Sequence, residues 1–137
     1  MTQETKLVTL AWREGLRFEG GAPGGPVTVI DGDNRLAPGP MLTLLLAAAS
    51  CSGADVVSIL EKMRVRLERF RIEAAGTRRE EDPRRFLSIH LTYHLEGEGL
   101  DEAKARRAVQ LSIDKYCSVI HSMASDLRIT YDLRLGS

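Results

Sequence analysis

A run of apolar residues in the first half of the chain constrains the fold more than any other feature. It covers residues 40–64 and reads PMLTLLLAAASCSGADVVSILEKMR. After Gly53 the apolar residues recur at helical spacing, at Val56, Ile59, Leu60, Met63 and Leu67. Before Gly53 the segment is apolar on every side, and such a helix has to be covered all round. One sheet covers one side, so we expect a second copy of the chain to cover the other.

The same run has the length of a membrane span, because a bilayer needs about 20 apolar residues. It contains Asp55 near its middle, and a central Asp costs roughly 2.5–3.5 kcal/mol on insertion. Both flanking segments are ordinary polar sequence. We therefore interpret residues 40–64 as a helix in a protein core and expect no membrane contact.

Length and charge limit the other possibilities. A chain of 137 residues is predicted to form a single domain over residues 1–137, large enough for a hydrophobic core. Its 19 basic and 19 acidic residues balance, which gives no electrostatic reason to expect nucleic acid as a partner. The N-terminal segment MTQETKLVTLAW lacks the pattern of a secretion signal. We expect a cytoplasmic protein, in which cysteines are usually free, metal-bound or catalytic.

Hydrophobic periodicity and turn residues predict three strands, the long helix, two strands, a second helical region and a final strand. In chain order the expected ranges are 6–12, around 17–18, 27–30, 40–64, 70–74, 87–95, 101–127 and 129–135. The polar segment 31–39 is predicted to be a loop, and residues 76–83 a charged turn. Strands in runs, rather than in strict alternation with helices, indicate an α+β fold with antiparallel sheets packed around the long helix.

The alternation of residue types also predicts which side chains are buried. In the strand 87–95 the expected inward residues are Leu87, Ile89, Leu91, Tyr93 and Leu95. Asp101 is expected to cap the second helical region. The apolar face of that region is expected to contain Ala105, Ala108, Val109, Ser112, Ile113 and Tyr116.

The two cysteines are the candidate reactive groups. Cys51 lies in the long apolar helix and Cys117 in the second helical region. A thiol reacts as the thiolate, and its attack on a peroxide gives a sulfenic acid that a second thiol can trap as a disulfide. Two readings stay open from the residues alone. Free cysteines are often only small core residues, and Cys51, Cys117 and His121 could bind a metal, although no close C-x-x-C pair accompanies them.

The two cysteine-centred segments, PMLTLLLAAASCSGADVVSILEKMR and DKYCSVIHSM, resemble the OsmC/Ohr family in sequence, order and separation. The resemblance extends over nearly the whole chain. It implies an α+β fold in which two chains intertwine as a homodimer, with the long apolar helix at the dimer centre. It also implies a cytosolic thiol peroxidase that reduces organic hydroperoxides, and hydrogen peroxide less well.

Carried over to this sequence, the resemblance makes Cys51 the peroxidatic thiol and Cys117 the resolving thiol. The family also uses an Arg from the N-terminal loops to orient the thiolate. Arg35 and Arg17 both fit by position, and we favour Arg35. No bound cofactor is implied, since a small dithiol or a lipoylated protein would reduce the disulfide.

The sequence departs from the family at one site. Members carry a Glu just after the Pro that opens the long helix, whereas Met41 and Leu42 follow Pro40 here. The main prediction is a thiol-dependent hydroperoxide reductase in oxidative or osmotic stress defence. The alternative is a weakly active, small-ligand-binding, stress-associated dimer with structural thiols. The paired cysteines favour the first and the missing carboxylate favours the second.

Overall fold

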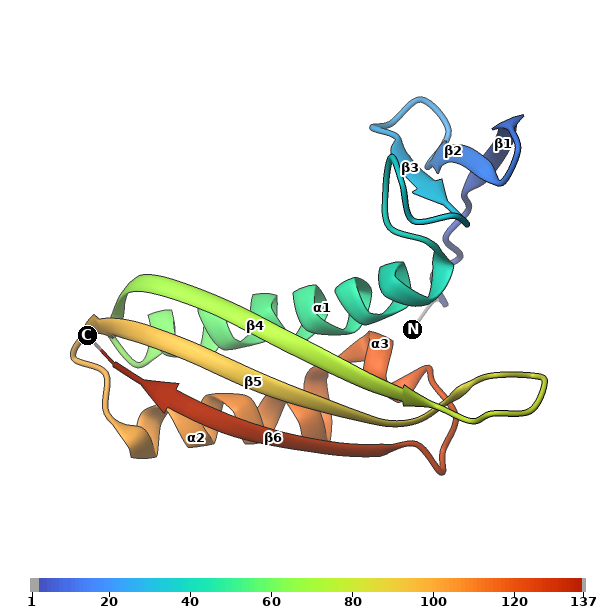
Figure 1. Cartoon of the computed structure of the whole chain (residues 1–137). Coiled ribbons are helices and arrows are strands. Elements are labelled where there is room, and N and C mark those ends of the chain that lie inside the picture. Colours follow the sequence, from blue (N-terminus) through green and yellow to red (C-terminus); the bar gives the residue numbers. More distant parts are fainter. Residues whose placement is uncertain (1–2, 137) are drawn as a thin grey trace. The chain divides into compact units, whose positions relative to one another are not determined.

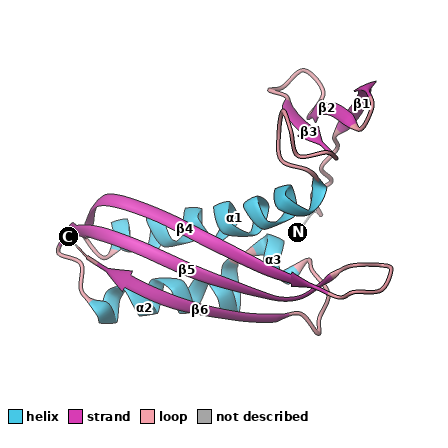
Figure 2. Cartoon of the chain, viewed as in Figure 1, coloured by secondary structure: helices cyan, strands magenta, loops and turns pink. Residues whose placement is uncertain are grey.

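The computed structural model describes residues 3–136. Its elements follow the predicted order of strands and helices, coloured by type in Figure 2. They are β1 (Thr9–Glu14), β2 (Arg17–Gly21), β3 (Thr28–Asp31), α1 (Pro40–Lys62), β4 (Arg66–Arg78), β5 (Phe86–Glu98), α2 (Glu102–Leu111), the π-helix η1 (Ser112–Tyr116), α3 (Ser118–His121) and β6 (Arg128–Leu135). The chain divides into two compact units, one ending at Leu44 and the other beginning at Leu45.

The N-terminal unit is built on a three-stranded antiparallel sheet in the order β1-β2-β3. Gly15 has a φ of 53° in the turn between β1 and β2, a conformation that costs glycine little because it has no Cβ. The three predicted strands are confirmed, with bounds shifted by a few residues. Within this unit large apolar side chains stay exposed, and Trp12 is 65% exposed. The sheet therefore leaves part of its apolar surface exposed.

Helix α1 confirms the predicted long helix and ends two residues before the expected position. It begins at Pro40, whose missing N–H costs nothing in the first turn of a helix. At the other end Arg64 takes a φ of 63°, and the amide of Val65 donates to the carbonyl of Leu60 at 3.0 Å. A left-handed residue just after the last turn is a common way to end a helix.

The C-terminal unit contains a second three-stranded sheet in the order β4-β5-β6. Strands β4 and β5 pair antiparallel, as predicted, but β5 and β6 run parallel. The prediction of purely antiparallel sheets is therefore wrong at this pair. The helical region between them acts as a crossover that returns the chain to the end where β5 began, which parallel pairing requires.

Helices cover one face of this sheet. Figure 1 shows α1 behind β4 and α2 behind β6, on the same side of the sheet. The apolar alternation explains this arrangement, since Leu91, Tyr93 and Leu95 of β5 are buried on the helix side. At Gly53 the helix comes close to the sheet, where an added Cβ would lie 3.3 Å from the Cδ1 atom of Ile72.

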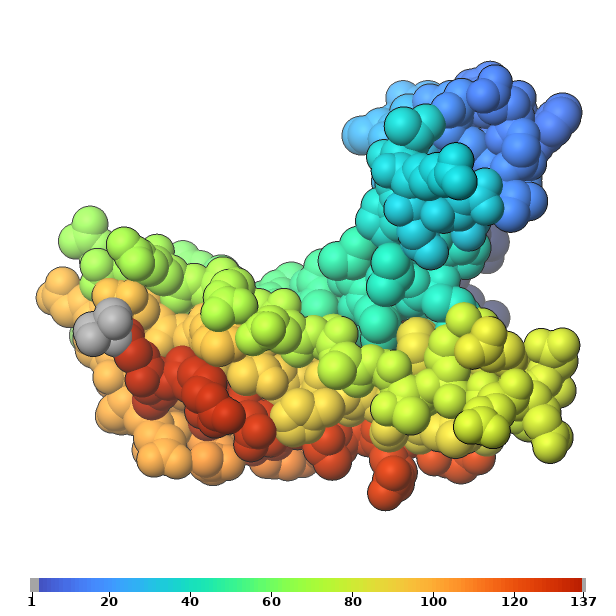
Figure 3. Space-filling model, in the orientation of Figure 1, coloured from blue at the N-terminus to red at the C-terminus, as the bar shows by residue number. Residues whose placement is uncertain are grey.

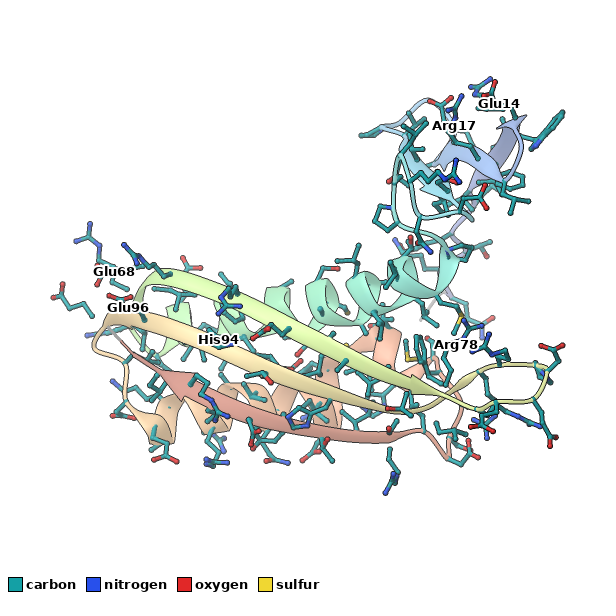
Figure 4. The ribbon with its side chains drawn as sticks, viewed as in Figure 1. Glu14, Arg17, Glu68, Arg78, His94 and Glu96 are labelled. Carbon is teal, nitrogen blue, oxygen red and sulfur yellow. The ribbon has the colours of Figure 1, made fainter. Side chains whose placement is uncertain are left out.

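The opposite face of the sheet is polar. Figure 3 shows β4 and β6 open to solvent in this view, and Figure 4 shows His94 on this side of β5. His94 hydrogen bonds to Glu73 at 2.6 Å, and His90 hydrogen bonds to Thr130 at 2.6 Å. Both histidines therefore lie on the face of the sheet opposite the helices.

Two sequence-based expectations about β4 and β5 are wrong in detail. Gly76 belongs to β4 rather than to the charged turn, which begins only after Arg78. Leu87 is 40% exposed, whereas the neighbouring Phe86 is buried. A register shift between Thr77 and Arg78 explains the second difference, because a shift of one residue moves side chains to the other face.

The second helical region is divided into three parts. Asp101 caps α2, as predicted, and its side chain accepts a hydrogen bond from the Lys104 amide at 2.8 Å. The helix then widens into the π-helix η1, and α3 follows after Cys117. Tyr116, expected on the apolar face, is 49% exposed instead. The wider turn of a π-helix changes the rotation per residue, so the 3.6-residue periodicity no longer predicts which face Tyr116 occupies.

By length and composition alone, α1 is one helix that could cross a membrane. Core helices pass the same test. The residues of α1 that are buried in the structure are Leu45, Ala48, Ser52, Gly53, Val56 and Leu60. They recur at helical spacing, so one face of α1 packs within the protein.

Candidate thiol site

Cys51 lies near the middle of α1 and is half-buried. Eleven residues separate it from the first residue of the helix, which corresponds to about 16 Å along the axis. The charge effect of a helix N-terminus falls off within the first turn, so α1 itself does not supply the positive end that a reactive thiol needs. If Cys51 is to react as a thiolate, a cation from another segment has to stabilise it.

Cys117 lies between η1 and α3 and is completely buried. Its amide donates to the carbonyl of Ser112 at 2.8 Å, which is the five-residue hydrogen bond of the π-helix. Its thiol lies 3.9 Å from the carbonyl oxygen of Ala48, three residues before Cys51 on α1. The fold thus brings the two cysteines together from opposite halves of the chain.

The surroundings of Cys117 favour its neutral thiol. Burial is the largest cause and raises the pKa of Cys117 to about 11, although a hydrogen bond from the Ile120 amide acts in the opposite direction. The side-chain interaction with Cys51 raises the pKa further, and the charge of Asp55 adds to the same effect. Cys117 is therefore held protonated at neutral pH.

A chain of polar side chains lies beside the cysteines. The hydroxyl oxygens of Ser52 and Tyr93 are 2.6 Å apart, and those of Ser52 and Ser112 are 2.8 Å apart. The hydroxyl of Ser112 is also 2.9 Å from a carboxylate oxygen of Asp55. Burial raises the pKa of Tyr93 to about 12, while its hydrogen bond to Ser52 lowers it. This hydrogen-bonded chain is not predictable from the sequence. The only signal was that Ser52 and Ser112 occupy apolar-face positions in two helices.

The candidate arginines both lie in the N-terminal unit. Arg35 is in the loop before α1, and the carboxylate of Asp31 orders that loop by accepting hydrogen bonds from backbone amides. These come from Asp33 at 2.9 Å, Leu36 at 3.0 Å and Arg35 itself at 3.2 Å. Arg17 pairs with Glu14 at 3.9 Å in the hairpin, where Figure 4 shows both residues. The ordered loop gives Arg35 a defined backbone position.

The first turn of α1 contains no acidic residue. Met41 and Leu42 follow Pro40, where other family members carry a Glu.

His121, the third member of the alternative metal site, hydrogen bonds through its ring to the carbonyl of Ile113 at 2.9 Å. Within residues 3–136 no three His, Cys, Asp or Glu side chains come together as a metal-binding group. The described structure therefore adds no support to the metal alternative.

The described structure is an α+β fold with two three-stranded sheets, a long helix and free cysteines in two helical regions. The family model described as OsmC-like protein matches residues 31–132, and the chain belongs to this family. The chain is similar to protein YhfA of Escherichia coli strain K12, with 41% identity over 121 residues that cover 88% of this chain and 90% of YhfA.

Solved structures share the fold. A hypothetical protein from Aquifex aeolicus VF5 has 29% identity and a TM-score of 0.83, covering 98% of this chain and 100% of the other. The organic hydroperoxide resistance protein OhrB of Bacillus subtilis has 17% identity and a TM-score of 0.62, covering 96% of this chain and 98% of OhrB. At that identity the second likeness is evidence for the fold alone.

Proposed function

We propose that the chain is a thiol-dependent reductase of organic hydroperoxides, in which Cys51 attacks the peroxide and Cys117 resolves the product. One observation carries the proposal: the buried thiol of Cys117 packs against α1, 3.9 Å from the carbonyl oxygen of Ala48, which lies three residues before Cys51. Family membership suggests a stress-related, peroxide-reducing role, and OhrB, which shares the fold, is named for hydroperoxide resistance.

The cycle has three steps. The Cys51 thiolate attacks the terminal peroxide oxygen, the O–O bond breaks, and the alkoxide takes a proton and leaves as the alcohol. Cys51 is then a sulfenic acid. The Cys117 sulfur attacks the Cys51 sulfur, the S–O bond breaks, and the hydroxide leaves as water with the Cys117 proton. An external dithiol, free or on a lipoylated protein, reduces the disulfide by exchange.

The different surroundings of the two thiols suit these roles. Cys51 is half-buried and can meet a substrate, whereas Cys117 is buried and held neutral. A neutral resolving thiol does not compete for peroxide, because the thiolate is the nucleophile. Arg35, carried by the loop that Asp31 orders, is the cation that we propose stabilises the Cys51 thiolate.

We further propose that the protein works as a homodimer in the cytoplasm. Two apolar residues of α1 within the C-terminal unit are exposed: Leu46 by 56% and Val57 by 44%. Eleven residues apart, they point to nearly the same side of the helix. Large apolar residues that are exposed on a largely apolar helix such as α1 mark an interaction surface. A second copy of the same helix would cover them.

A second candidate function is binding of a small apolar ligand by a dimer with structural thiols. The first turn of α1 lacks a carboxylate, and the high pKa of Cys117 also fits a thiol that serves only as a core residue. Peroxidase activity would then be weak.

Turnover of cumene hydroperoxide and hydrogen peroxide with dithiothreitol tests the proposal, in the wild type and in the Cys51→Ser and Cys117→Ser variants. We expect organic peroxide to be preferred and turnover to disappear in Cys51→Ser. Arg35→Met should lower the rate of the first step, with Arg17→Met as the matched control. If the wild type consumes peroxide no faster than dithiothreitol alone, the reductase proposal is wrong and the ligand-binding function is favoured.

A further inference from the structure

Four side chains from three elements form one hydrogen-bonded chain beside the thiol pair. Ser52 and Asp55 come from α1, Tyr93 from β5 and Ser112 from η1. Ser52, Tyr93 and Ser112 are completely buried, and only Asp55 is partly exposed. Among the described residues every buried side-chain polar atom has a hydrogen-bond partner. The chain is therefore a fully satisfied polar network inside an apolar core.

Counting donors fixes the direction of the chain. Each hydroxyl has one hydrogen to donate, and an ionised carboxylate only accepts. The hydroxyl of Ser112 faces both Ser52 and Asp55, and the charged acceptor forms the stronger hydrogen bond. Ser112 thus donates to Asp55, Ser52 donates to Ser112, and Tyr93 donates to Ser52. The carboxylate of Asp55 is the fixed end that orients the other three.

Ser112 connects this chain to both cysteines. Its hydroxyl is held by Asp55 and Ser52, and Ser52 directly follows Cys51 on α1. Its carbonyl accepts the amide hydrogen of Cys117 at 2.8 Å. One residue therefore links the helix that carries the first thiol to the turn that carries the second. Single π-helical turns are often found at functional sites.

We propose that Ser112, held by Asp55, is a positioning residue that places the Cys117 sulfur for disulfide closure with Cys51. This inference rests on the Cys51–Cys117 pair of the proposed function. It assigns the π-helix a role, since this five-residue turn lets the Ser112 hydroxyl reach α1 while its carbonyl fixes Cys117. Without the hydrogen bond between Ser112 and Asp55, η1 can relax toward α-helical spacing and move the Cys117 sulfur.

Disulfide closure can be measured without peroxide by adding Ellman's reagent to reduced protein from which the free reductant has been removed. The Cys51 thiolate attacks the reagent disulfide and releases one thionitrobenzoate, leaving a mixed disulfide. The Cys117 thiol then loses its proton to solvent and attacks the Cys51 sulfur, which releases the second thionitrobenzoate. The first release reports the reactivity of Cys51 and the second reports closure.

In Ser112→Ala we expect the first release to keep the wild-type rate and the second to slow about tenfold, which corresponds to about 1.4 kcal/mol. Ser122→Ala is the matched control, because the Ser122 hydroxyl donates to the carbonyl of Ser118 on an exposed surface. Tyr93→Phe removes the far end of the chain and leaves the Ser112–Asp55 link intact. The disulfide of the Tyr93→Phe variant should therefore close nearly as fast as that of the wild type.

Asp55→Asn is a second variant that does not depend on burying an altered residue, since Asp55 is partly exposed. The titratable groups that face Cys117 are Cys51 and Asp55 from α1 and Tyr93 from β5. The charge of Asp55 raises the pKa of Cys117, so its loss by itself favours the thiolate and speeds closure. A slower second release in Asp55→Asn would therefore come from lost positioning.

The inference would be overturned if the wild type showed no second release, or if the second release in Ser112→Ala or Asp55→Asn were as fast as in the wild type. Equal slowing of the first and second releases would overturn it as well. Equal slowing in Tyr93→Phe and Ser112→Ala would also overturn it, because the effect would then belong to the whole network. A protein that shows two releases but consumes no hydroperoxide would disprove the proposed function and leave this inference intact.

Discussion

The Sγ atom of Cys117 lies 3.9 Å from the carbonyl oxygen of Ala48, one helical turn before Cys51 on α1. This contact joins residues 69 positions apart in the sequence. The Cys117 thiol is buried between α1 and the η1–α3 junction, and no part of the Cys117 side chain reaches solvent. Because the thiol is buried, its raised pKa and its effect on stability can be measured without an activity assay.

The raised pKa of Cys117 predicts a loss of stability at high pH. An unfolded cysteine titrates at about 8.5, whereas burial raises the pKa of folded Cys117 to about 11. Between these values the unfolded chain releases a proton that the folded chain keeps, so this contribution to the free energy of unfolding is full below about pH 8.5 and falls as pH rises. Urea unfolding of reduced protein at several pH values should show a shallower decline in Cys117→Ser. Parallel curves for the two proteins would contradict the burial of an ionisable thiol.

The loop that carries Arg35 should loosen in acid. The carboxylate of Asp31 accepts three backbone amide hydrogen bonds, and these, chiefly those from Leu36 and Asp33, lower the pKa of Asp31 below its usual value. A lowered pKa stabilises the folded loop above that value, and the contribution is lost as pH falls through the folded pKa. Hydrogen exchange at the amides of residues 33, 35 and 36 should accelerate in Asp31→Ala at neutral pH. Asp33→Ala, which keeps the acceptor, is the control, and equal exchange in both variants would show that Asp31 does not order the loop.

Gly76 should not tolerate a side chain. An added Cβ would lie 2.6 Å from the Cδ1 atom of the buried Phe86 ring and 3.0 Å from Leu45. Overpacking of this kind costs about 1–3 kcal/mol, so Gly76→Ala should lower the free energy of unfolding by that amount in urea. Gly136→Ala, with nothing within 4 Å of the added atom, should leave it unchanged. Adding Phe86→Leu to Gly76→Ala should recover part of the loss, and no recovery would mean that the strain lies elsewhere.

The exposed face of α1 predicts a change of oligomeric state. In Leu46→Glu the new charge would have to be buried in a dimer formed through this helix, which is unfavourable without a partner charge. Light scattering coupled to size-exclusion chromatography should detect a dimer for the wild type and a monomer for Leu46→Glu. Leu87→Glu, on a 40% exposed residue of β5, serves as a matched control. A monomeric wild type would show that the dimer proposal is wrong.

Overoxidation should reveal the resolving role of Cys117. Without a second thiol, the Cys51 sulfenic acid persists and reacts with more peroxide to give the sulfinic acid. Mass spectrometry of Cys117→Ser after cumene hydroperoxide should therefore find two added oxygens on Cys51, whereas the wild type should contain a disulfide. If the wild type accumulates the same sulfinic acid at the same rate, Cys117 does not resolve Cys51.

Local sequence patterns predict the order of the elements and the long apolar helix. These follow from local patterns: the spacing of apolar residues in residues 40–64, the alternation in β5, and the cap at Asp101 all depend on neighbours a few positions away. The family followed as well, because the two cysteine-centred segments are contiguous motifs. The burial of Ile89, Leu91, Tyr93 and Leu95 also needed no more than strand alternation.

Features that depend on pairing between distant segments become visible only in the folded chain. The parallel pairing of β5 with β6, the register shift that buries Phe86 instead of Leu87, and the outward position of Tyr116 are of this kind. The hydrogen-bonded chain through Ser52 and Ser112 is another, since these residues lie 60 positions apart. The physical reason is that a periodic pattern specifies which side of an element is apolar, whereas register, crossover direction and buried polar contacts depend on the elements packed against it.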